Sequence, residues 1–255
     1  MDRVSEAQVQ HELVATPEGQ SLLRGLAVRR TAISLGLVAA LTIFLWWLPA
    51  SSRQSLVGSL FANRMLIGLL SVFGLIAISL LWSLGQRLDV WLFRALNLNG
   101  YHAAWWDRVM WLGTQAGNAG LGAAIVVVAY LLGYHGFAIA LTLGSLTLWL
   151  LVTIIKALTD RARPFNLLRD TRVIGWRAHG LSFPSGHTAQ TFFTVTLAIS
   201  QFKFHVVVAV VLYGLAIGVG ITRVYLGMHY PRDVIAGAIL ALIWGILGVL
   251  VAPYL

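Results

Sequence analysis

Basic and imidazole side chains gather in three short segments in the second half of this chain. The segments span residues 156–164, 182–188 and 222–233. Each borders a long apolar run, and charged groups at membrane depth usually face a bundle interior or a watery cavity. The loop 159–184 joins two predicted membrane spans, 137–158 and 186–202, which are the fourth and fifth of seven. The link 225–232 joins the last two, 205–224 and 233–251. All three segments therefore fall on one side of the membrane, where we expect one cavity to gather them.

The first segment carries two cations at a helical spacing. Arg163 follows Lys156 by seven positions, about two helical turns, so both side chains project from one face. Pro164 cannot continue a helix and is expected to end it there. Two cations held close together need an anion between them. The alternative, two basic side chains that snorkel from a helix end to the membrane surface, stays open for this pair.

The second segment resembles a helix start built for an anion. Pro184 breaks the chain ahead of an apolar run, and Ser185 is a natural N-cap. Gly186 has no side chain where backbone would approach a ligand, and free N–H groups at a helix start bind phosphate well. His187 then lies in the first turn, beside that anion. Taken alone, an ordinary capped helix with a chance histidine also explains this pattern.

The third segment places an imidazole next to a carboxylate. Pro231 fits the first position of the last helix, so His229 lies just outside it and Asp233 lies within its first turn. A carboxylate there can accept from one imidazole nitrogen, which leaves the other free to attack. A purely structural His–Asp contact at a helix start is the alternative.

Together, the three segments resemble the signature of the type-2 phosphatidic acid phosphatase family in order and spacing. The family pattern is Lys-x6-Arg-Pro, Pro-Ser-Gly-His and Ser-Arg-x5-His-x3-Asp. The first two parts match completely, and the third matches with Thr222 where the family usually has serine. Threonine keeps the hydroxyl, so only the role of that hydroxyl is in doubt. The resemblance covers roughly residues 86–255.

This resemblance implies a metal-free phosphatase with a histidine nucleophile. By resemblance, His229 attacks phosphorus, Asp233 orients it, and His187 protonates the leaving group and then activates water. The phosphate-binding residues would be Lys156, Arg163, Ser185, Gly186 and Arg223. No cofactor and no metal are implied. The residues agree with this, because metal-dependent phosphatases cluster carboxylates around their ions. After residue 107 the chain offers only Asp160, Asp170 and Asp233.

The substrate is expected to be a lipid phosphate, because the site opens at membrane depth. Candidates are phosphatidic acid, phosphatidylglycerol phosphate, undecaprenyl diphosphate and phosphorylated lipid A. Five further basic residues either contact a headgroup or merely flank the membrane: Arg161, Arg169, Arg172, Arg177 and His179. Beyond this substrate and membrane lipids, no partner is indicated, and the oligomeric state is left open.

Composition places the whole chain in a membrane. Of 255 residues, 58% are hydrophobic and 11% are charged, about half of the charge usual in soluble domains. Several apolar runs approach the ~20 residues that span a bilayer as a helix. We predict an all-α transmembrane bundle in the cell's inner membrane, with a six-helix core and one extra N-terminal span. The seven spans are residues 31–49, 65–84, 117–132, 137–158, 186–202, 205–224 and 233–251.

The predicted organisation has three parts. Residues 1–30 form a polar segment, residues 31–85 hold two spans, and residues 86–255 form the catalytic core. Within the core, residues 85–116 mix charges with tryptophans, which suits an amphipathic segment in the headgroup region. There is no cysteine, which excludes thiolate metal sites and a cysteine nucleophile.

Other functions fit the residues less well. The net charge of +9 is mostly flanking charge of a membrane protein, and no soluble basic domain for nucleic acid is present. A lipid phosphotransferase could use the same phosphohistidine, and a transporter of anionic lipid would also bury charges. Vanadium haloperoxidases have a similar anion site but are soluble. Seven spans with a cytoplasmic N-terminus put the site on the cytoplasmic face, whereas the family's site usually faces outward, and both orientations stay open.

Overall fold

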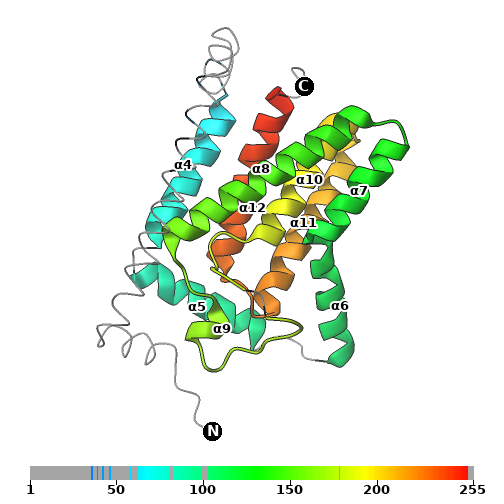
Figure 1. Ribbon diagram of the computed structural model, residues 1–255. Coiled ribbons are helices and arrows are strands. Elements are labelled where there is room, and N and C mark those ends of the chain that lie inside the picture. The colour runs from blue at the N-terminus through cyan, green and yellow to red at the C-terminus, as the bar shows by residue number, and fades with distance from the viewer. Residues whose placement is uncertain are drawn as a thin grey trace.

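The computed structural model describes residues 63–80, 83–98, 103–177 and 179–251, with isolated helical positions at 36, 39, 42, 46 and 58. The polar segment 1–30 lies outside the described residues, and so does the first predicted span, 31–49, apart from four of those positions. Within the described residues all regular structure is helical, in agreement with the all-α prediction (Figure 1). The helices are α4 (Arg64–Ser79), α5 (Ser83–Asn97), α6 (Ala104–Thr114), the 3-10 turn η1 (Gln115–Gly117), α7 (Ala119–Leu131), α8 (His135–Thr159), α9 (Pro164–Leu167), α10 (Gly186–Phe202), α11 (Val206–Tyr225) and α12 (Pro231–Val251).

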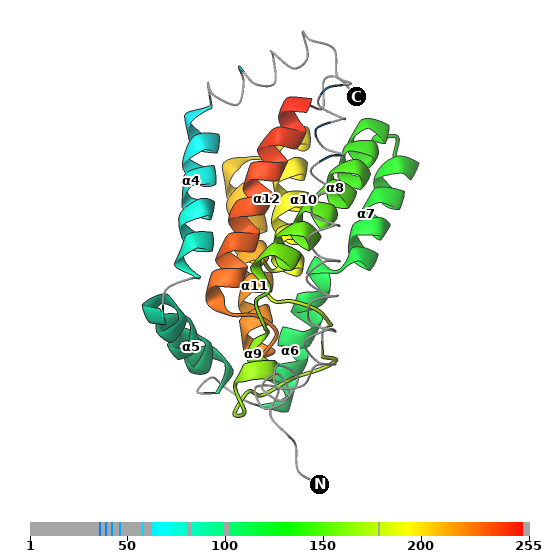
Figure 2. The same ribbon diagram turned by 60° about the vertical axis from the view of Figure 1, so that its left-hand side comes forward.

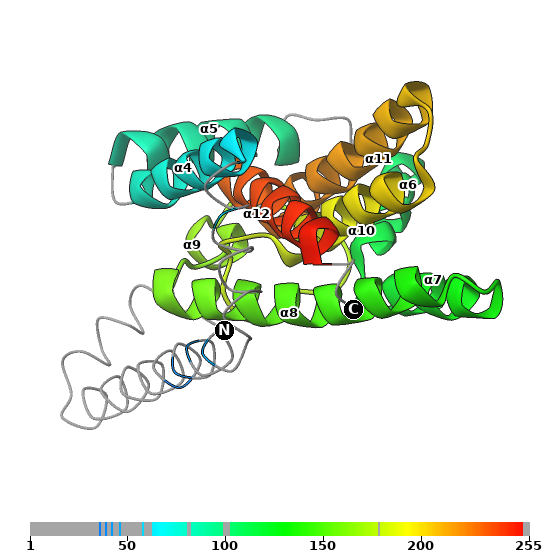
Figure 3. The same cartoon turned by 90° about the horizontal axis from the view of Figure 1, so that it is seen from above.

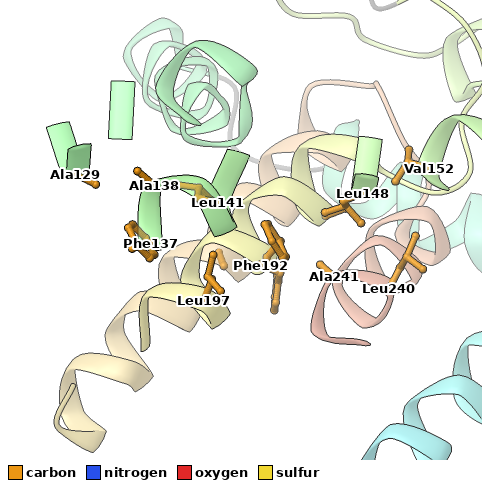
Figure 4. Close-up of a cluster of buried hydrophobic side chains, with 13 residues drawn as sticks. Ala129, Phe137, Ala138, Leu141, Leu148, Val152, Phe192, Leu197, Leu240 and Ala241 are labelled. Carbon is orange, nitrogen blue, oxygen red and sulfur yellow. The ribbon is translucent and has the colours of Figure 1, made fainter. Parts of the chain in front are cut away.

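Helix α10 lies at the centre of the bundle. It packs against α12, α11 and α8, and α12 lies between α4 on one side and α8 on the other (Figure 3). Side chains from these helices interlock in one apolar cluster, which includes Phe137 and Leu141 of α8, Phe192 of α10, and Leu240 of α12 (Figure 4). Burying a large apolar side chain contributes about 1.5–3 kcal/mol in water. In lipid the close packing itself provides the attraction between helices.

The outside of the bundle is apolar, as expected for helices in contact with lipid. On α11 alone, Val206, Val210, Leu215 and Ile217 are all exposed. Among the described residues, three helical stretches are long and apolar enough to cross a membrane: His135–Leu167, Val206–Tyr225 and Pro231–Val249. A bent pair, Ala104–Gly117 with Ala119–Leu131, makes a fourth if it counts as one span. The structure supports a membrane protein but does not confirm seven spans.

The predicted third span, 117–132, agrees with α7, but the segment before it differs from the prediction. Residues 85–116 were expected to lie in the headgroup region as an amphipathic segment. Instead, α6 continues through η1 into α7, with a bend of 54° between them. The bend comes at Asn118, whose side chain caps α7 by accepting from the N–H of Leu121 at 2.8 Å. An asparagine cap starts a new helix in a new direction, so the polar and apolar parts form one broken rod.

Helix α5 does have the predicted amphipathic character. Its buried stripe repeats every four residues, at Asp89, Phe93 and Asn97, while Trp91 and Leu88 are exposed on the opposite side. The four-residue repeat is the spacing of one helical face. Helix α5 lies across the lower end of the bundle, below α4, in Figures 1 and 2. The helix ends that carry the three basic segments lie at this same end of the bundle.

Candidate active site

The three segments meet at one end of the bundle, as the sequence predicted. The C-terminal end of α8, the N-terminal end of α10 and the link between α11 and α12 all lie at the lower end in Figure 1. Hydrogen bonds join them directly. Ser185 N donates to Asp233 O at 2.9 Å, and Arg163 Nη1 donates to Met228 O at 3.0 Å. Residues far apart in the sequence, up to 65 positions for this second pair, therefore line a single site.

His229 is held by the short link after α11. The link turns at Gly227, whose φ of +82° favours glycine, and a Cβ there would lie 2.6 Å from the carbonyl oxygen of Arg172. The His229 N–H then donates to Arg223 O at 3.2 Å. The His229 side chain is buried. Backbone contacts thus fix the position of His229, in addition to the contacts of its side chain.

The hydrogen bonds of His229 assign its tautomer. Nη1 of Arg163 lies 3.1 Å from Nε2, and a guanidinium has donors but no acceptor. Nε2 must therefore accept, and the proton lies on Nδ1. Nδ1 is 3.4 Å from Ser182 Oγ and 3.6 Å from Asp233 Oδ2. This is the arrangement in which Nε2 keeps the lone pair.

Asp233 is buried behind His229 and is held at both carboxylate oxygens. Oδ2 accepts from Ser182 Oγ at 2.5 Å and from Tyr230 N at 2.9 Å, while Oδ1 accepts from Arg161 Nη1 at 2.6 Å. The predicted His229–Asp233 pairing is present, but at 3.6 Å it is longer than a hydrogen bond. Ser182 bridges the two groups, and its part was missed in the sequence.

Electrostatics favour the neutral form of His229. Burial lowers its pKa well below the usual value, and the positive charges of Arg163, Lys156 and Arg223 lower it further. An unprotonated imidazole has a lone pair to donate. The cations that would hold an anion also act on this histidine, which indicates that they surround it.

The first segment is shaped differently from the prediction. Helix α8 ends at Thr159, because Asp160 takes a left-handed conformation with φ of 45°, and Pro164 begins α9 instead of ending α8. Lys156 and Arg163 therefore do not share a helical face. The backbone of residues 179–182 brings them together: Lys156 Nζ donates to Leu181 O at 2.5 Å, and Arg163 Nε donates to Gly180 O at 2.9 Å.

Helix α10 begins at Gly186, as predicted, with Ser185 at the N-cap position. Ser185 does not cap with its side chain, however, because its Oγ is 2.9 Å from Thr188 Oγ1. The first N–H groups of any α-helix have no acceptor within the helix, and they carry the positive end of its dipole. His187, partly exposed, stands in this first turn. Anion binding by this turn stays a prediction.

Two glycines outside the motif press against this turn. A Cβ on Gly117 of η1 would lie 2.7 Å from the carbonyl oxygen of His187, and one on Gly237 of α12 would lie 2.5 Å from that of Ser185. Gly186 itself is different, since a Cβ there would make only ordinary contact with Val152 at 3.8 Å. Packing within the protein therefore requires the two outer glycines but does not require glycine at position 186.

Arg223 reaches the site from the last turn of α11. Its Nη1 donates to Thr114 Oγ1 at 2.9 Å, and its buried Nε has no hydrogen-bond partner among the described residues. A buried donor without a partner is costly, so this atom suits a ligand oxygen. Thr222, the departure from the family pattern, turns its hydroxyl to its own helix and donates to Val219 O at 2.6 Å.

The five candidate headgroup residues divide into two groups. Arg161 is buried against Asp233 and Asp89, and Arg172 forms a two-pronged salt bridge with Asp107 at 2.8 and 3.0 Å. Both guanidiniums are engaged inside the protein, which argues against headgroup contacts for them. The other three, Arg169, Arg177 and His179, are exposed.

Metal ligation was not expected, and the described part of the chain contains no group of three or more His, Asp or Glu side chains placed to hold an ion. Independence from metal stays a prediction for experiment.

Comparison with known proteins decides the family. The PAP2 superfamily model matches residues 131–255. A lipid A 4'-phosphatase from Bacteroides thetaiotaomicron is 31% identical over 166 residues, which cover 57% of this chain and 69% of the relative. The chain belongs to the PAP2 superfamily. The family resemblance predicted from the three segments is confirmed.

Two other curated relatives share the same region. The undecaprenyl-diphosphatase of Sulfolobus acidocaldarius is 32% identical and covers 41% of this chain, and the bacitracin transport permease protein BcrC of Bacillus licheniformis is 35% identical and covers 40%. The match spans about half the length of each, 46% and 49%.

Solved structures agree with the fold. The transmembrane PAP2-type phosphatidylglycerolphosphate phosphatase from Bacillus subtilis matches with a TM-score of 0.63 and 26% identity, over 72% of this chain and 93% of that structure. Aquifex aeolicus LpxE matches with a TM-score of 0.57 and 27% identity, over 63% of this chain and 94% of that structure. The all-helical membrane fold of this PAP2 protein is therefore shared with membrane phosphatases.

Proposed function

We propose that this PAP2 protein hydrolyses a lipid phosphate through a phosphohistidine on His229. The observation that carries the proposal is the contact of Arg163 Nη1 with His229 Nε2 at 3.1 Å. It keeps Nε2 unprotonated and puts a cation next to it, and the guanidinium would pass its hydrogen bond from Nε2 to a phosphoryl oxygen before Nε2 attacks. A phosphoryl group attacked by Nε2 would have its oxygens within reach of that same guanidinium.

The first step forms a P–N bond and breaks a P–O bond. The Nε2 lone pair attacks phosphorus while the lipid oxygen leaves, and protonated His187 gives that oxygen its proton. Nδ1–H stays directed at Asp233 and Ser182, which stabilise the positive ring. In the second step water attacks phosphorus, His187 takes a proton from the water, and the P–N bond breaks to release phosphate. In each step one bond to phosphorus forms, one bond to phosphorus breaks, and His187 transfers one proton.

Charge stabilisation would come from four groups. Phosphoryl transfer places negative charge on the equatorial oxygens, so preorganised donors supply most of the catalysis. Lys156 and Arg163 are held by the backbone of residues 179–182, Arg223 has its unpartnered Nε, and the first turn of α10 adds N–H donors. We propose that these positive groups take the part that magnesium plays in other phosphatases.

The substrate is proposed as a class. The relatives include a lipid A 4'-phosphatase, an undecaprenyl-diphosphatase and a phosphatidylglycerolphosphate phosphatase, so the shared chemistry is a phosphate on a lipid. Arg169, Arg177 and His179 remain candidates for headgroup contact. The backbone oxygen of His179 accepts from Arg163 Nη2 at 3.2 Å, which puts this loop at the rim of the site. Residues 86–255 are proposed as the catalytic core of a multi-pass inner-membrane protein.

The test is phosphate release by the detergent-purified protein in EDTA, from a panel of phosphatidic acid, phosphatidylglycerol phosphate, undecaprenyl diphosphate and lipid A. Wild type should release phosphate, and His229→Ala should not. His135→Ala is the matched control, because His135 is exposed at the opposite end of α8 from Lys156. Rapid quenching with labelled substrate should trap an alkali-stable, acid-labile phosphoprotein in the wild type.

Other results would point elsewhere. Activity that EDTA abolishes would refute the metal-free mechanism. Phosphate that passes to an added lipid or sugar acceptor, instead of water, would identify a phosphotransferase. No turnover with any lipid would refute the proposed activity.

A further inference from the structure

A chain of buried ion pairs runs from α5 to the carboxylate behind the nucleophile. Asp89 pairs with Arg161 Nη2, and Arg232 donates to it twice, from N at 3.0 Å and from Nε at 2.8 Å. Arg161 then uses its other nitrogen, Nη1, to reach Asp233 Oδ1 at 2.6 Å. The order is Arg232, Asp89, Arg161, Asp233.

The charges of these four ion-paired residues cancel. Two carboxylates face two guanidiniums, and the side chains are 0% exposed for Asp89 and Asp233, 9% for Arg161 and 14% for Arg232. Removing one partner of a buried pair leaves an uncompensated charge, which is strongly unfavourable. Each member therefore depends on the others to stay in place.

Arg161 determines how Asp233 faces His229. By holding Oδ1, it turns Oδ2 toward Ser182, the Tyr230 N–H and His229 Nδ1. Arg161 also lies over the Tyr230 ring, 4.3 Å from its centroid. Without this clamp only Oδ2 would be held, by Ser182 and the Tyr230 N–H, and the plane of the carboxylate would be less firmly fixed. The groups that face Nδ1 of His229 would then be less well aligned.

Asp89 in turn orients Arg161. The guanidinium is a planar fork, so anchoring Nη2 on Asp89 aims Nη1 in one direction. Gln86, one turn earlier on α5, accepts from Arg161 Nη2 at 2.9 Å and from Arg232 Nη2 at 3.3 Å. The α5 backbone also lies close, since a Cβ on Gly85 would be 2.6 Å from Arg232 Nη1. Helix α5, which contributes no phosphate-binding residue, is thus linked to the Asp233 carboxylate through Arg161.

We propose that Asp89 is a positioning residue for phosphoryl transfer, acting through Arg161 to fix Asp233 behind the nucleophile. The inference rests on the function proposed above and adds a residue that lies outside the three motifs. It also assigns a role to Arg161 that differs from contact with a lipid headgroup. A purely structural ion network would hold α5 in place without affecting His229.

The test compares Asp89→Asn with a matched variant, Asp170→Asn. Asp170 also pairs with an arginine of α5, Arg94, at 3.0 Å, but both side chains are nearly half exposed. Asp89→Asn should lower kcat about 10- to 100-fold with KM within about threefold, because small misplacements at a catalytic group cost this much. Asp170→Asn should change neither by more than about twofold, as exposed pairs contribute little. Asp89→Glu should recover part of kcat.

A double variant separates positioning from stability. Asp89→Asn with Arg161→Gln again balances the buried charges, since one carboxylate, Asp233, and one guanidinium, Arg232, remain. Thermal stability should return toward wild type while kcat stays low, because the clamp on Asp233 is still missing. Return of kcat together with stability would refute the positioning role.

A second readout needs no turnover. In protein with 15N-labelled histidine, the His229 ring signals are assigned by their loss in His229→Gln, and their shifts report the tautomer. Wild type should show hydrogen on Nδ1. Asp89→Asn should keep this tautomer, because Arg163 still donates to Nε2, but should shift the Nδ1 resonance as the groups facing Nδ1 move. An unchanged Nδ1 resonance together with unchanged kcat would overturn the inference. If wild type hydrolyses no lipid phosphate, the proposed function fails, and a shift of the Nδ1 resonance would still support the coupling.

Discussion

Nη1 of Arg163 lies 3.1 Å from Nε2 of His229, and this contact determines where the imidazole proton is. Because a guanidinium only donates, the proton must be on Nδ1, toward Ser182 and Asp233. The cation that would neutralise the transferred phosphoryl group is therefore also the group that keeps the nucleophilic nitrogen unprotonated. Binding and activation depend on the same side chain.

The first prediction concerns pH. Burial, and then the charges of Arg163, Lys156 and Arg223, hold the pKa of His229 well below 6.5. Since only neutral imidazole attacks, kcat/KM should fall on the acid side only below the ordinary histidine range. Lys156→Met removes one of these charges, so the pKa of His229 should rise and the acid limb should move to higher pH.

The measurement is kcat/KM against pH for wild type and Lys156→Met on one substrate, so that the substrate's own ionisation cancels. Lys203→Met is the control, because this lysine is exposed at the far end of α10. An acid limb that stays in place or moves to lower pH in Lys156→Met would contradict the argument.

The second prediction concerns Ser182, which bridges Asp233 Oδ2 at 2.5 Å and His229 Nδ1 at 3.4 Å. A hydrogen bond to a charged group contributes roughly 1.5 kcal/mol, which corresponds to about tenfold in rate. Ser182→Ala should therefore lower kcat about tenfold with little change in KM. Ser145→Ala removes a hydrogen-bonded serine on α8, whose Oγ accepts from Gln190 at 2.8 Å, and should leave kcat unchanged. Equal kcat in both variants would exclude a bridging role.

Local chemistry in the sequence predicted more of the site than long-range geometry did. The proline and glycine of the second segment fixed the start of α10 at Gly186, since both act on the backbone next to them. The predicted span 137–158 agrees with α8, but the expectation that the helix continues to Pro164 was wrong, because Asp160 leaves the helix in a left-handed turn before Pro164 can act. Lys156 and Arg163 still meet, through a loop whose path no helical periodicity describes.

The residues that were missed act across long distances in sequence. Ser182 and Thr114 are ordinary polar residues until folding brings them to Asp233 and Arg223. Asp89 did leave a signal, because it shares a four-residue repeat with Phe93 and Asn97 on an amphipathic helix. A carboxylate on that buried stripe needs a cation, but the sequence alone does not say that Arg161 supplies it.

The third prediction concerns the packing behind the anion site. A Cβ on Gly237 would lie 2.5 Å from the carbonyl oxygen of Ser185, and backbone cannot move aside as a side chain can. Gly237→Ala should cost about 1–3 kcal/mol of stability, as overpacking does, and should lower activity by displacing the first turn of α10. Gly218→Ala is the control, because nothing lies within 4 Å of its Cβ position and alanine favours helix. The measurements are the thermal unfolding temperature and the turnover of both variants. A Gly237→Ala protein as stable and active as Gly218→Ala would contradict the packing argument.

The fourth prediction concerns the side of the membrane on which the site opens. The chain has no cysteine, so single cysteines can be placed at will. His179 is exposed on the loop at the rim of the site, and His205 is exposed at the opposite end of α11. With the outward orientation usual for the family, an impermeant thiol reagent should label His179→Cys in whole cells and His205→Cys only after permeabilisation. The reverse pattern would place the site on the cytoplasmic face. This is the orientation predicted for seven spans with the N-terminus in the cytoplasm. His205 caps the N-terminal end of α11, whereas Arg163 joins the backbone of His179 to the link after the C-terminal end of α11. Each position therefore serves as the control for the other, and labelling of both from outside would mean that α11 does not separate two aqueous compartments.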